Sequence, residues 1–407
     1  MDARASGGPR HGGVDWSWER HAVCVVDDAG EVVDRFDVQH GRRELQEMGS
    51  RLRSRGVERV AIERPDGPVV DALLATGLQV VVISPRQVRA YRLRHGTAGN
   101  KDDRFDAFVL AEALRTDGHR MASLQPDAAA TRALRALVRA RKDLVGHRIA
   151  VHNQLLANLQ QAFPGAVGLF AQLDSPISLT FLRRFPTAQR ARWLSERRLT
   201  SWLRSVGYAG RRSAAELMVH LDAAPEGLSG EAGEAFGVVT TELVGLLGQI
   251  RDRTQVLERR IAEALELHRD GEIFRSLPRA GVIRAALLLA EVGDCRGRFP
   301  DESSLAAAAG VAPSTRASGK RRAVSFRRGC DKQLRAALID FAQDSVQASP
   351  WARDIYDRAR SRGCRHPHAV RILAPRLGAG DLAVLDGWRA LRPGPPRGGD
   401  TPRRLMA

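Results

Sequence analysis

The chain has 407 residues and a formal net charge of +17, an excess of basic residues that suits a polyanionic partner such as a nucleic acid. Its longest apolar runs fall far below the roughly 20 residues that a membrane-spanning helix needs, and the polar first ten residues lack the apolar core of a signal peptide. The four cysteines are far apart and form no CxxC pair, which argues against a zinc site or a disulfide framework. We therefore expect a cytoplasmic protein that binds nucleic acid and no membrane.

Residues 12–124 alternate strand-like and helix-like stretches. The expected strands are 13–18, 21–27, 31–38, 57–63 and 78–83, and the expected helices are 42–55, 69–75 and 102–115. A turn signal at 27–30 joins two of the first three strands into a meander, and Pro85 ends the last strand. The meander followed by crossover units predicts an α/β domain with a mixed sheet, similar in element order to an RNase H-like domain.

Residues 127–268 are nearly all helix-forming. Two long amphipathic stretches, 131–161 and 234–267, carry apolar residues three and four apart, and they flank a region of shorter helices at 164–228. This pattern fits a helical hairpin or coiled-coil oligomerisation arm, and it fits an ordinary helical bundle equally well. Basic residues of the first stretch, Arg135, Arg139 and Lys142, form either a solvated face or a surface for nucleic-acid phosphates.

Residues 272–391 are expected to be mostly α-helical. The turn at 277–281 before the apolar run 282–292 resembles a helix-hairpin-helix turn, in which backbone amides contact a phosphate. A polar basic loop follows at 313–322, and helices are expected at 334–345 and 351–361. The tail at 392–407 is rich in proline, glycine and arginine, which predicts disorder.

Carboxylates in predicted apolar strands are unusual in so basic a chain. Asp15 lies in the first expected strand and Glu63 ends a later one, while Asp103 and Asp106 share one face of the 102–115 helix. Singly, each acid is better explained as a surface residue, or as an acid at a helix N-terminus. Together and in this order, they favour a site for Mg²⁺ or Mn²⁺, which prefer oxygen ligands and can serve phosphodiester transfer.

Several motifs carry a family likeness. They are Val14-Asp15-Trp16, Ile62-Glu63-Arg64-Pro65, the K-x-D-x-x-D-A pattern over 101–107, the segments 277–281 and 286–294, and 305–313 followed by Ala-Ser-Gly-Lys at 317–320. This ordered set resembles the Piv-type DEDD transposases of bacterial insertion sequences, the group often called the IS one-ten family. The likeness extends over about residues 12–372.

The resemblance implies a multidomain protein in which two domains each contribute residues to catalysis. A RuvC-like domain (12–124) would hold Mg²⁺ or Mn²⁺ through Asp15, Glu63, Asp103 and Asp106. A C-terminal transposase domain (272–391) would supply Ser318 as the nucleophile that forms a phosphoserine link to DNA, with Ser314 as a competing position. Lys320, Arg321 and Arg322 would bind the phosphate, because Ser318 has no neighbouring base in the sequence.

The resemblance also implies partners. These are DNA, a structured bridge RNA that pairs with donor and target DNA, and further copies of the chain in a dimer or tetramer at the bacterial nucleoid. A protein that binds nucleic-acid backbones while base pairing reads the sequence suits the charge of +17 and the aromatic content of 5%. The acids and the serine could meet within one subunit or between two.

The chain departs from the family pattern at two places. Residues 157–230 look longer than a usual linker, and Pro375 interrupts what would be a continuing C-terminal helix. Two other functions stay open: a junction-resolving type of nuclease that uses the acids and water, and a nucleic-acid-binding protein without catalysis.

Overall fold

A computed structural model describes residues 8–95, 102–299, 301–318 and 321–387. The chain divides into two compact units, Met1–Pro126 (unit 1) and Asp127–Ala407 (unit 2). None of the described helices is both long enough and apolar enough to cross a membrane.

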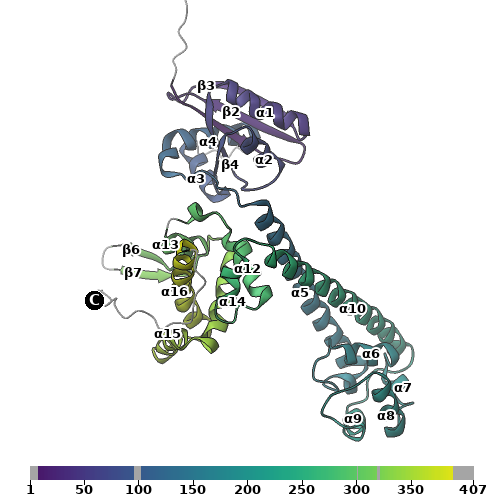
Figure 1. Cartoon of the computed structure of the whole chain (residues 1–407). Helices are drawn as coiled ribbons and strands as arrows, with labels where there is room; N and C mark the ends of the chain where they lie inside the picture. The colour runs from purple at the N-terminus through teal and green to yellow at the C-terminus, as the bar shows by residue number, and fades with distance from the viewer. Residues whose placement is uncertain (1–7, 96–101, 300, 319–320, 388–407) are drawn as a thin grey trace, which may run out of the picture. The chain divides into compact units, whose positions relative to one another are not determined.

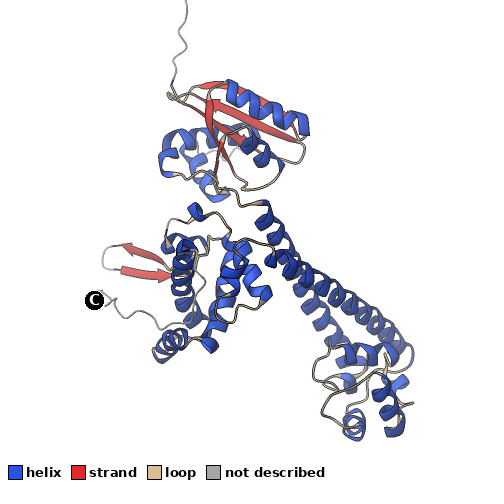
Figure 2. Cartoon of the chain, in the orientation of Figure 1, coloured by secondary structure: helices blue, strands red, loops and turns tan. Residues whose placement is uncertain are grey.

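Unit 1 is built on a five-stranded mixed sheet. Its strands are β1 (Arg10–Asp15), β2 (Arg20–Val26), β3 (Val32–Gln39), β4 (Val57–Ile62) and β5 (Gln79–Val82); its helices are α1 (Arg42–Ser54), α2 (Pro68–Ala75), α3 (Pro85–His95), α4 (Asp103–Asp117) and the 3₁₀ turn η1 (Gly118–Arg120). The strand order is β3-β2-β1-β4-β5, with the first three strands antiparallel and β4 and β5 parallel to β1. The sheet is drawn in red in Figure 2. This confirms the expected RNase H-like topology.

Helices cover both faces of this sheet. On one face, Leu45, Met48 and Leu52 of α1 and Val69 and Leu73 of α2 form a buried cluster with alternate strand residues, among them Val14, Val60 and Ile62. On the other face, α4 packs Val109, Leu110 and Leu114 against Ala61 and Val81. Side chains alternate between the faces of a strand, so the sheet contributes residues to a core on each face. The domain therefore has three layers: helices, sheet and helices.

Gly13 sets how closely α4 approaches the centre of the sheet. A Cβ atom at this position would overlap the carbonyl oxygen of Ala107 and lie 2.5 Å from the backbone nitrogen of Ala111. The absence of a side chain therefore lets the helix backbone lie directly on β1.

Unit 2 contains two long paired helices and a smaller helical region inserted between them. The elements are α5 (Ala129–Ala162), η2 (Pro164–Ala166), α6 (Pro176–Arg184), α7 (Ala188–Ala191), α8 (Glu196–Ser205), α9 (Ala214–Asp222) and α10 (Gly230–Glu266). Helices α5 and α10 lie side by side along their lengths (Figure 1). Within this unit the two helices form a helical hairpin, one of the arrangements left open by the sequence.

The inserted helices α6–α9 cap one end of the hairpin. Phe181, Leu199 and Leu217 from the insert pack with Leu155 of α5 and Leu247 of α10 in one buried cluster. The insert is therefore part of a folded core rather than a loose linker.

The rest of unit 2 contains a second core and a hairpin. Its elements are α11 (Gly271–Arg275), α12 (Val282–Val292), η3 (Arg296–Arg298), α13 (Glu302–Ala308), β6 (Ser314–Ser318), β7 (Arg321–Ser325), α14 (Lys332–Ala348), α15 (Pro350–Ser361) and α16 (His366–Gly387). Two expectations are corrected here. The segment read as a basic loop forms the antiparallel β6–β7 hairpin. Pro375 lies inside α16, because Val370 and Leu373 of this helix are anchored in the core and packing outweighs the lost backbone bond.

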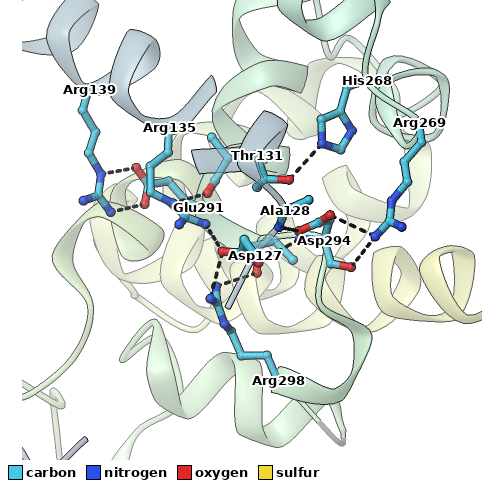
Figure 3. Close-up of polar contacts among 12 residues, drawn as sticks. Asp127, Ala128, Thr131, Arg135, Arg139, His268, Arg269, Glu291, Asp294 and Arg298 are labelled. Atoms are coloured by element: carbon cyan, nitrogen blue, oxygen red, sulfur yellow. Dashed lines mark hydrogen bonds and ion pairs between the residues drawn. The ribbon is translucent and has the colours of Figure 1, made fainter. Parts of the chain in front are cut away.

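A buried charge network ties the start of α5 to the end of α12 (Figure 3). Asp127, fully buried, accepts hydrogen bonds from Arg135, from Arg298 at 2.8 Å and from the backbone amide of Asp294 at 3.1 Å. In return, the Ala128 amide donates to Asp294 at 3.0 Å. Burial alone would raise the pKa of Asp294, but hydrogen bonds from Ala128 and Thr131 and the charge of Arg269 outweigh it and hold this pKa below its ordinary value.

We predict that Gly13→Ala destabilises unit 1 by about 1–3 kcal/mol, because the new methyl group must push α4 away from β1. The matched control is Gly146→Ala in α5, where an added Cβ has no atom within 4 Å and alanine favours the helix. Thermal unfolding monitored by circular dichroism would measure both variants. An unchanged melting temperature for Gly13→Ala would contradict the close-approach argument.

We predict that Asp127→Ala destabilises unit 2 by about 3–5 kcal/mol, because it leaves two arginines partly buried without their shared carboxylate. Glu226→Ala is the control, since it removes the partner of Arg192 in a pair exposed on both sides and should change stability by at most about 0.5 kcal/mol. Chemical denaturation of the full chain distinguishes the two. Equal effects would show that the buried network contributes no more than a surface pair.

Candidate active site

Two of the four predicted acids lie at the same edge of the unit 1 sheet. Asp15 is the last residue of β1, and Glu63 directly follows β4. These strands are parallel neighbours whose register pairs Val14 with Ile62. The next residue of each strand is therefore one of the two acids, and they emerge side by side.

Both acids belong to the sheet face that α4 covers. Gly13 meets the backbone of α4, and Ala61 packs against the same helix. Strand residues two apart share a face, which assigns Asp15 and Glu63 to the α4 side. Arg59 near the start of β4 donates to the Gly118 carbonyl just after the end of α4 at 2.8 Å, so the helix runs opposite to the strand and its first turn, with two acids, lies toward the end of β4.

The first turn of α4 begins at a side-chain cap. Asp102 is the N-cap, and its carboxylate accepts a hydrogen bond from the Arg104 amide at 3.3 Å. Asp103 is exposed in this turn, while Asp106 is buried immediately before Ala107, the residue that contacts Gly13. The cap therefore fixes where the helix begins. Asp102 has a structural role as the N-cap, while Asp103 and Asp106 remain the candidate ligands of the helix.

Asp106 has a strong partner that the sequence did not reveal. Arg92 of α3 donates to both carboxylate oxygens of Asp106, from Nε at 2.7 Å and from Nη2 at 2.6 Å. Asp106 is 4% exposed, so this bidentate pair is largely shielded from water. Helix α3 was missed because Pro85 was read only as the end of a strand, whereas proline is also favoured in the first turn of a helix.

Over the described part of the chain, no group of three or more acidic, histidine or cysteine side chains is arranged to hold a metal ion. The chemistry of the donor set nevertheless fits a hard divalent cation, because all four acids offer carboxylate oxygens. In the structure Arg92 binds both carboxylate oxygens of Asp106, so a cation at Asp106 would compete with this guanidinium group or share the carboxylate with it.

Aromatic and basic residues follow the acids in the sequence, on the opposite face of the sheet. Trp16 follows Asp15, Arg64 follows Glu63, and the guanidinium carbon of Arg64 lies 4.3 Å from the centre of the Trp16 ring. Nearby, His21 and His40 are joined by a 2.9 Å hydrogen bond. Burial, with a contribution from His40, lowers the pKa of His21 to about 4, so this ring is neutral at pH 7.

The predicted nucleophile lies in unit 2, at the end of β6. Ser318 is exposed and pairs with Arg321 across the hairpin, while its competitor Ser314 begins the same strand and pairs with Ser325. In β7, the backbone of Arg322 pairs with Ala317 of β6. Lys320, which the sequence associates with phosphate binding, lies outside the described residues.

Three basic residues expected to contact phosphates have intramolecular partners in the structure. Arg135 bonds to the buried Asp127 and to the carbonyl of Ala290, and Arg139 forms a bidentate pair with Glu291 at 2.9 and 2.7 Å (Figure 3). The Lys142 ammonium group donates to the Gln333 side chain at 2.6 Å. Ala290 and Glu291 belong to α12 and Gln333 to α14, helices that the sequence could not place beside α5. Nucleic-acid binding by these three basic residues stays a prediction.

Two family profiles match successive parts of this chain. Residues 12–164 match a family profile described as a transposase, and residues 271–357 match the profile of the transposase IS116/IS110/IS902 family. A similar relative is the mini-circle putative transposase for IS117 of Streptomyces coelicolor. It is 33% identical over 389 residues, which cover 90% of this chain and 91% of that protein.

Two further relatives and one solved structure are similar to the chain. The insertion element IS116 44.8 kDa protein of Streptomyces clavuligerus is 28% identical and covers 94% of this chain and 96% of its own length. The putative transposase y4uE of Sinorhizobium fredii is 34% identical over 48% of this chain and 56% of its own. T. thermophilus RuvC in complex with a Holliday junction substrate aligns with 28% of this chain and 99% of that chain, at 15% identity and a TM-score of 0.24.

The two family profiles and the relative that is 33% identical over nine-tenths of the sequence lead to one assignment. This chain belongs to the IS116/IS110/IS902 family of transposases.

Proposed function

We propose that this DNA transposase cuts and rejoins DNA with four carboxylates of unit 1 and a serine nucleophile of unit 2, guided by a structured bridge RNA. The observation that carries the proposal is the shared edge and shared sheet face of Asp15 and Glu63, next to the helix that bears Asp103 and Asp106. Carboxylate oxygens are the ligands that Mg²⁺ and Mn²⁺ prefer.

The acids Asp15, Glu63, Asp103 and Asp106 would hold Mg²⁺ or Mn²⁺. Such an ion, when bound, stabilises the negative charge that develops on the phosphate and lowers the pKa of an attacking hydroxyl. Arg92 supplies the positive charge that balances Asp106 in the structure as it stands. Binding of a cation by Asp106 would free this guanidinium group, which matches phosphate oxygens in geometry.

Ser318 is proposed as the nucleophile. Its Oγ forms a bond to the scissile phosphorus while the bond from phosphorus to the departing sugar oxygen breaks, and that oxygen leaves as a hydroxyl. The resulting phosphoserine ester keeps the phosphate activated, so that a DNA hydroxyl can later displace the serine and rejoin the strand. The exposed position of Ser318 at a hairpin end supports access to a duplex.

The charge of the chain supports nucleic-acid partners. A net charge of +17 favours contact with phosphate backbones of either DNA or RNA, and it carries no sequence information itself. A guide RNA would supply the base pairing that selects the target, and assembly into a dimer or tetramer would bring two DNA sites together.

We predict that Asp15→Ala, Glu63→Ala or Asp106→Ala lowers strand exchange by at least about a hundredfold, with nucleic-acid affinity nearly unchanged. EDTA should have the same effect on the wild type. Strand exchange is followed on labelled DNA in the presence of co-purified RNA. The control is Glu58→Gln, an exposed acid of β4 that should keep full activity. Full activity in any of the three alanine variants would refute the assignment of that acid.

We predict that wild-type protein forms a covalent adduct with DNA on a denaturing gel and that Ser318→Ala forms none. Ser314→Ala is the matched control at the other end of β6 and should keep the adduct. Free cut ends in both wild type and Ser318→Ala would favour a nuclease that uses water. Nucleic-acid binding without Mg²⁺-dependent breakage would favour a protein without catalysis.

A further inference from the structure

An exposed tryptophan lies in the loop that follows Asp15. Trp18 is 73% exposed, in the short loop between β1 and β2. An indole left in water forgoes the stabilisation that burial of so large an apolar group would give. Trp18 is therefore a candidate for binding a partner rather than for stabilising the fold.

The loop is held in place by specific hydrogen bonds. Ser17 Oγ donates to the Arg20 carbonyl at 2.6 Å and accepts from the Arg20 amide at 3.1 Å, and the His40 amide donates to the Glu19 carbonyl at 2.9 Å. The Ser17 amide also donates to Nδ1 of His21 at 3.3 Å. The indole of Trp18 is therefore presented by an ordered loop.

Aromatic and cationic neighbours surround Trp18. Its ring contacts Trp16 edge to face, with centroids 5.6 Å apart, and His40 in the same manner at 6.2 Å. The guanidinium carbon of Arg64 lies 6.0 Å from the Trp18 ring centre. These side chains line one hollow together with Asp66, Gly67 and Pro68. The hollow thus combines flat π surfaces with a guanidinium group whose Nε donates to the Asp66 carboxylate at 2.7 Å.

This chemistry suits an unpaired nucleotide. Nucleobases stack on exposed aromatic rings with little regard to sequence, and a guanidinium group pairs with the neighbouring phosphate. The hollow lies at the same end of β1 and β4 as the candidate catalytic acids but on the opposite sheet face, because Trp16 packs against the α1 and α2 cluster and Ile62 lines the hollow. A DNA strand that crosses this end of the sheet would reach both the acids and the loop.

We propose that Trp18 stacks on an unpaired DNA base at the end of the sheet that bears the acids and, with Arg64, positions the strand where it crosses this end. The inference rests on the proposed function for the identity of the strand as DNA and for the role of the acids. Trp18 is here a residue that binds and positions substrate, because its side chain offers no group for proton or phosphoryl transfer.

The test uses the full chain in EDTA with a 12-nucleotide single-stranded DNA probe that contains 2-aminopurine, whose fluorescence falls on stacking. Wild type should quench the probe. Trp18→Ala should lose the quenching and bind about tenfold more weakly, and Trp18→Phe should restore most of both. Trp193→Ala is the matched control, because Trp193 is also exposed and lies under an arginine, Arg198, at 4.5 Å.

Equal quenching and affinity in wild type and Trp18→Ala would overturn the proposal. Equal quenching of an RNA probe of the same sequence, with no preference for DNA, would overturn the choice of DNA. Thermal unfolding of the Trp18 variants verifies that each is folded.

A parallel cleavage assay of the wild type with Mg²⁺ distinguishes failure of the proposed function from failure of the stacking site. Absent cleavage with Trp18-dependent quenching counts against the proposed function and leaves the stacking site supported. Cleavage with quenching that does not depend on Trp18 counts only against the stacking site.

Discussion

The close approach of α4 to β1 at Gly13 is the constraint on which the candidate active site depends. The helix backbone can lie on the strand only because no Cβ intervenes. This contact brings the first turn of α4 to the sheet edge where Asp15 and Glu63 emerge on the same face. The acids are thus positioned by packing in the middle of the domain, and the site inherits the rigidity of that packing.

A different principle organises unit 2. The buried carboxylate of Asp127 and its partners bind the beginning of α5 to the end of α12, which are more than 150 residues apart in the chain. Buried charges of this kind are costly when a partner is missing, so they fix one arrangement more effectively than they add stability. Arg135, Arg139 and Arg298 serve this arrangement, since each donates to a buried carboxylate of the network.

Much of the fold could be predicted from local patterns, and the pairing of side chains could not. Strand alternation and turn residues predicted the meander and the mixed sheet, and helical periodicity predicted α5 and α10 within a few residues. Helix α3 has only Val88 buried and begins at a proline, so it carries little of the periodicity that marks a helix. The β6–β7 hairpin is short, polar and basic, which is why its residues were read as a loop.

The same limit applies to the candidate site. Spacing within the sequence placed Asp103 and Asp106 on one helix face. Asp15 within one expected strand and Glu63 at the end of another stood out as acids among apolar residues. The Arg92 partner of Asp106 depends on how α3 packs against α4, a tertiary fact with no local signal. For this reason the sequence could suggest a carboxylate site but could not show that one of its acids is already paired.

Titration of the full chain with Mn²⁺, followed by electron paramagnetic resonance, tests the central claim most directly. The account predicts that the wild type binds Mn²⁺ and that Asp15→Asn and Asp106→Asn each weaken this binding by at least about tenfold, because each removes a charged oxygen ligand. Equal Mn²⁺ affinity in the wild type and both variants would contradict a metal site built from these acids.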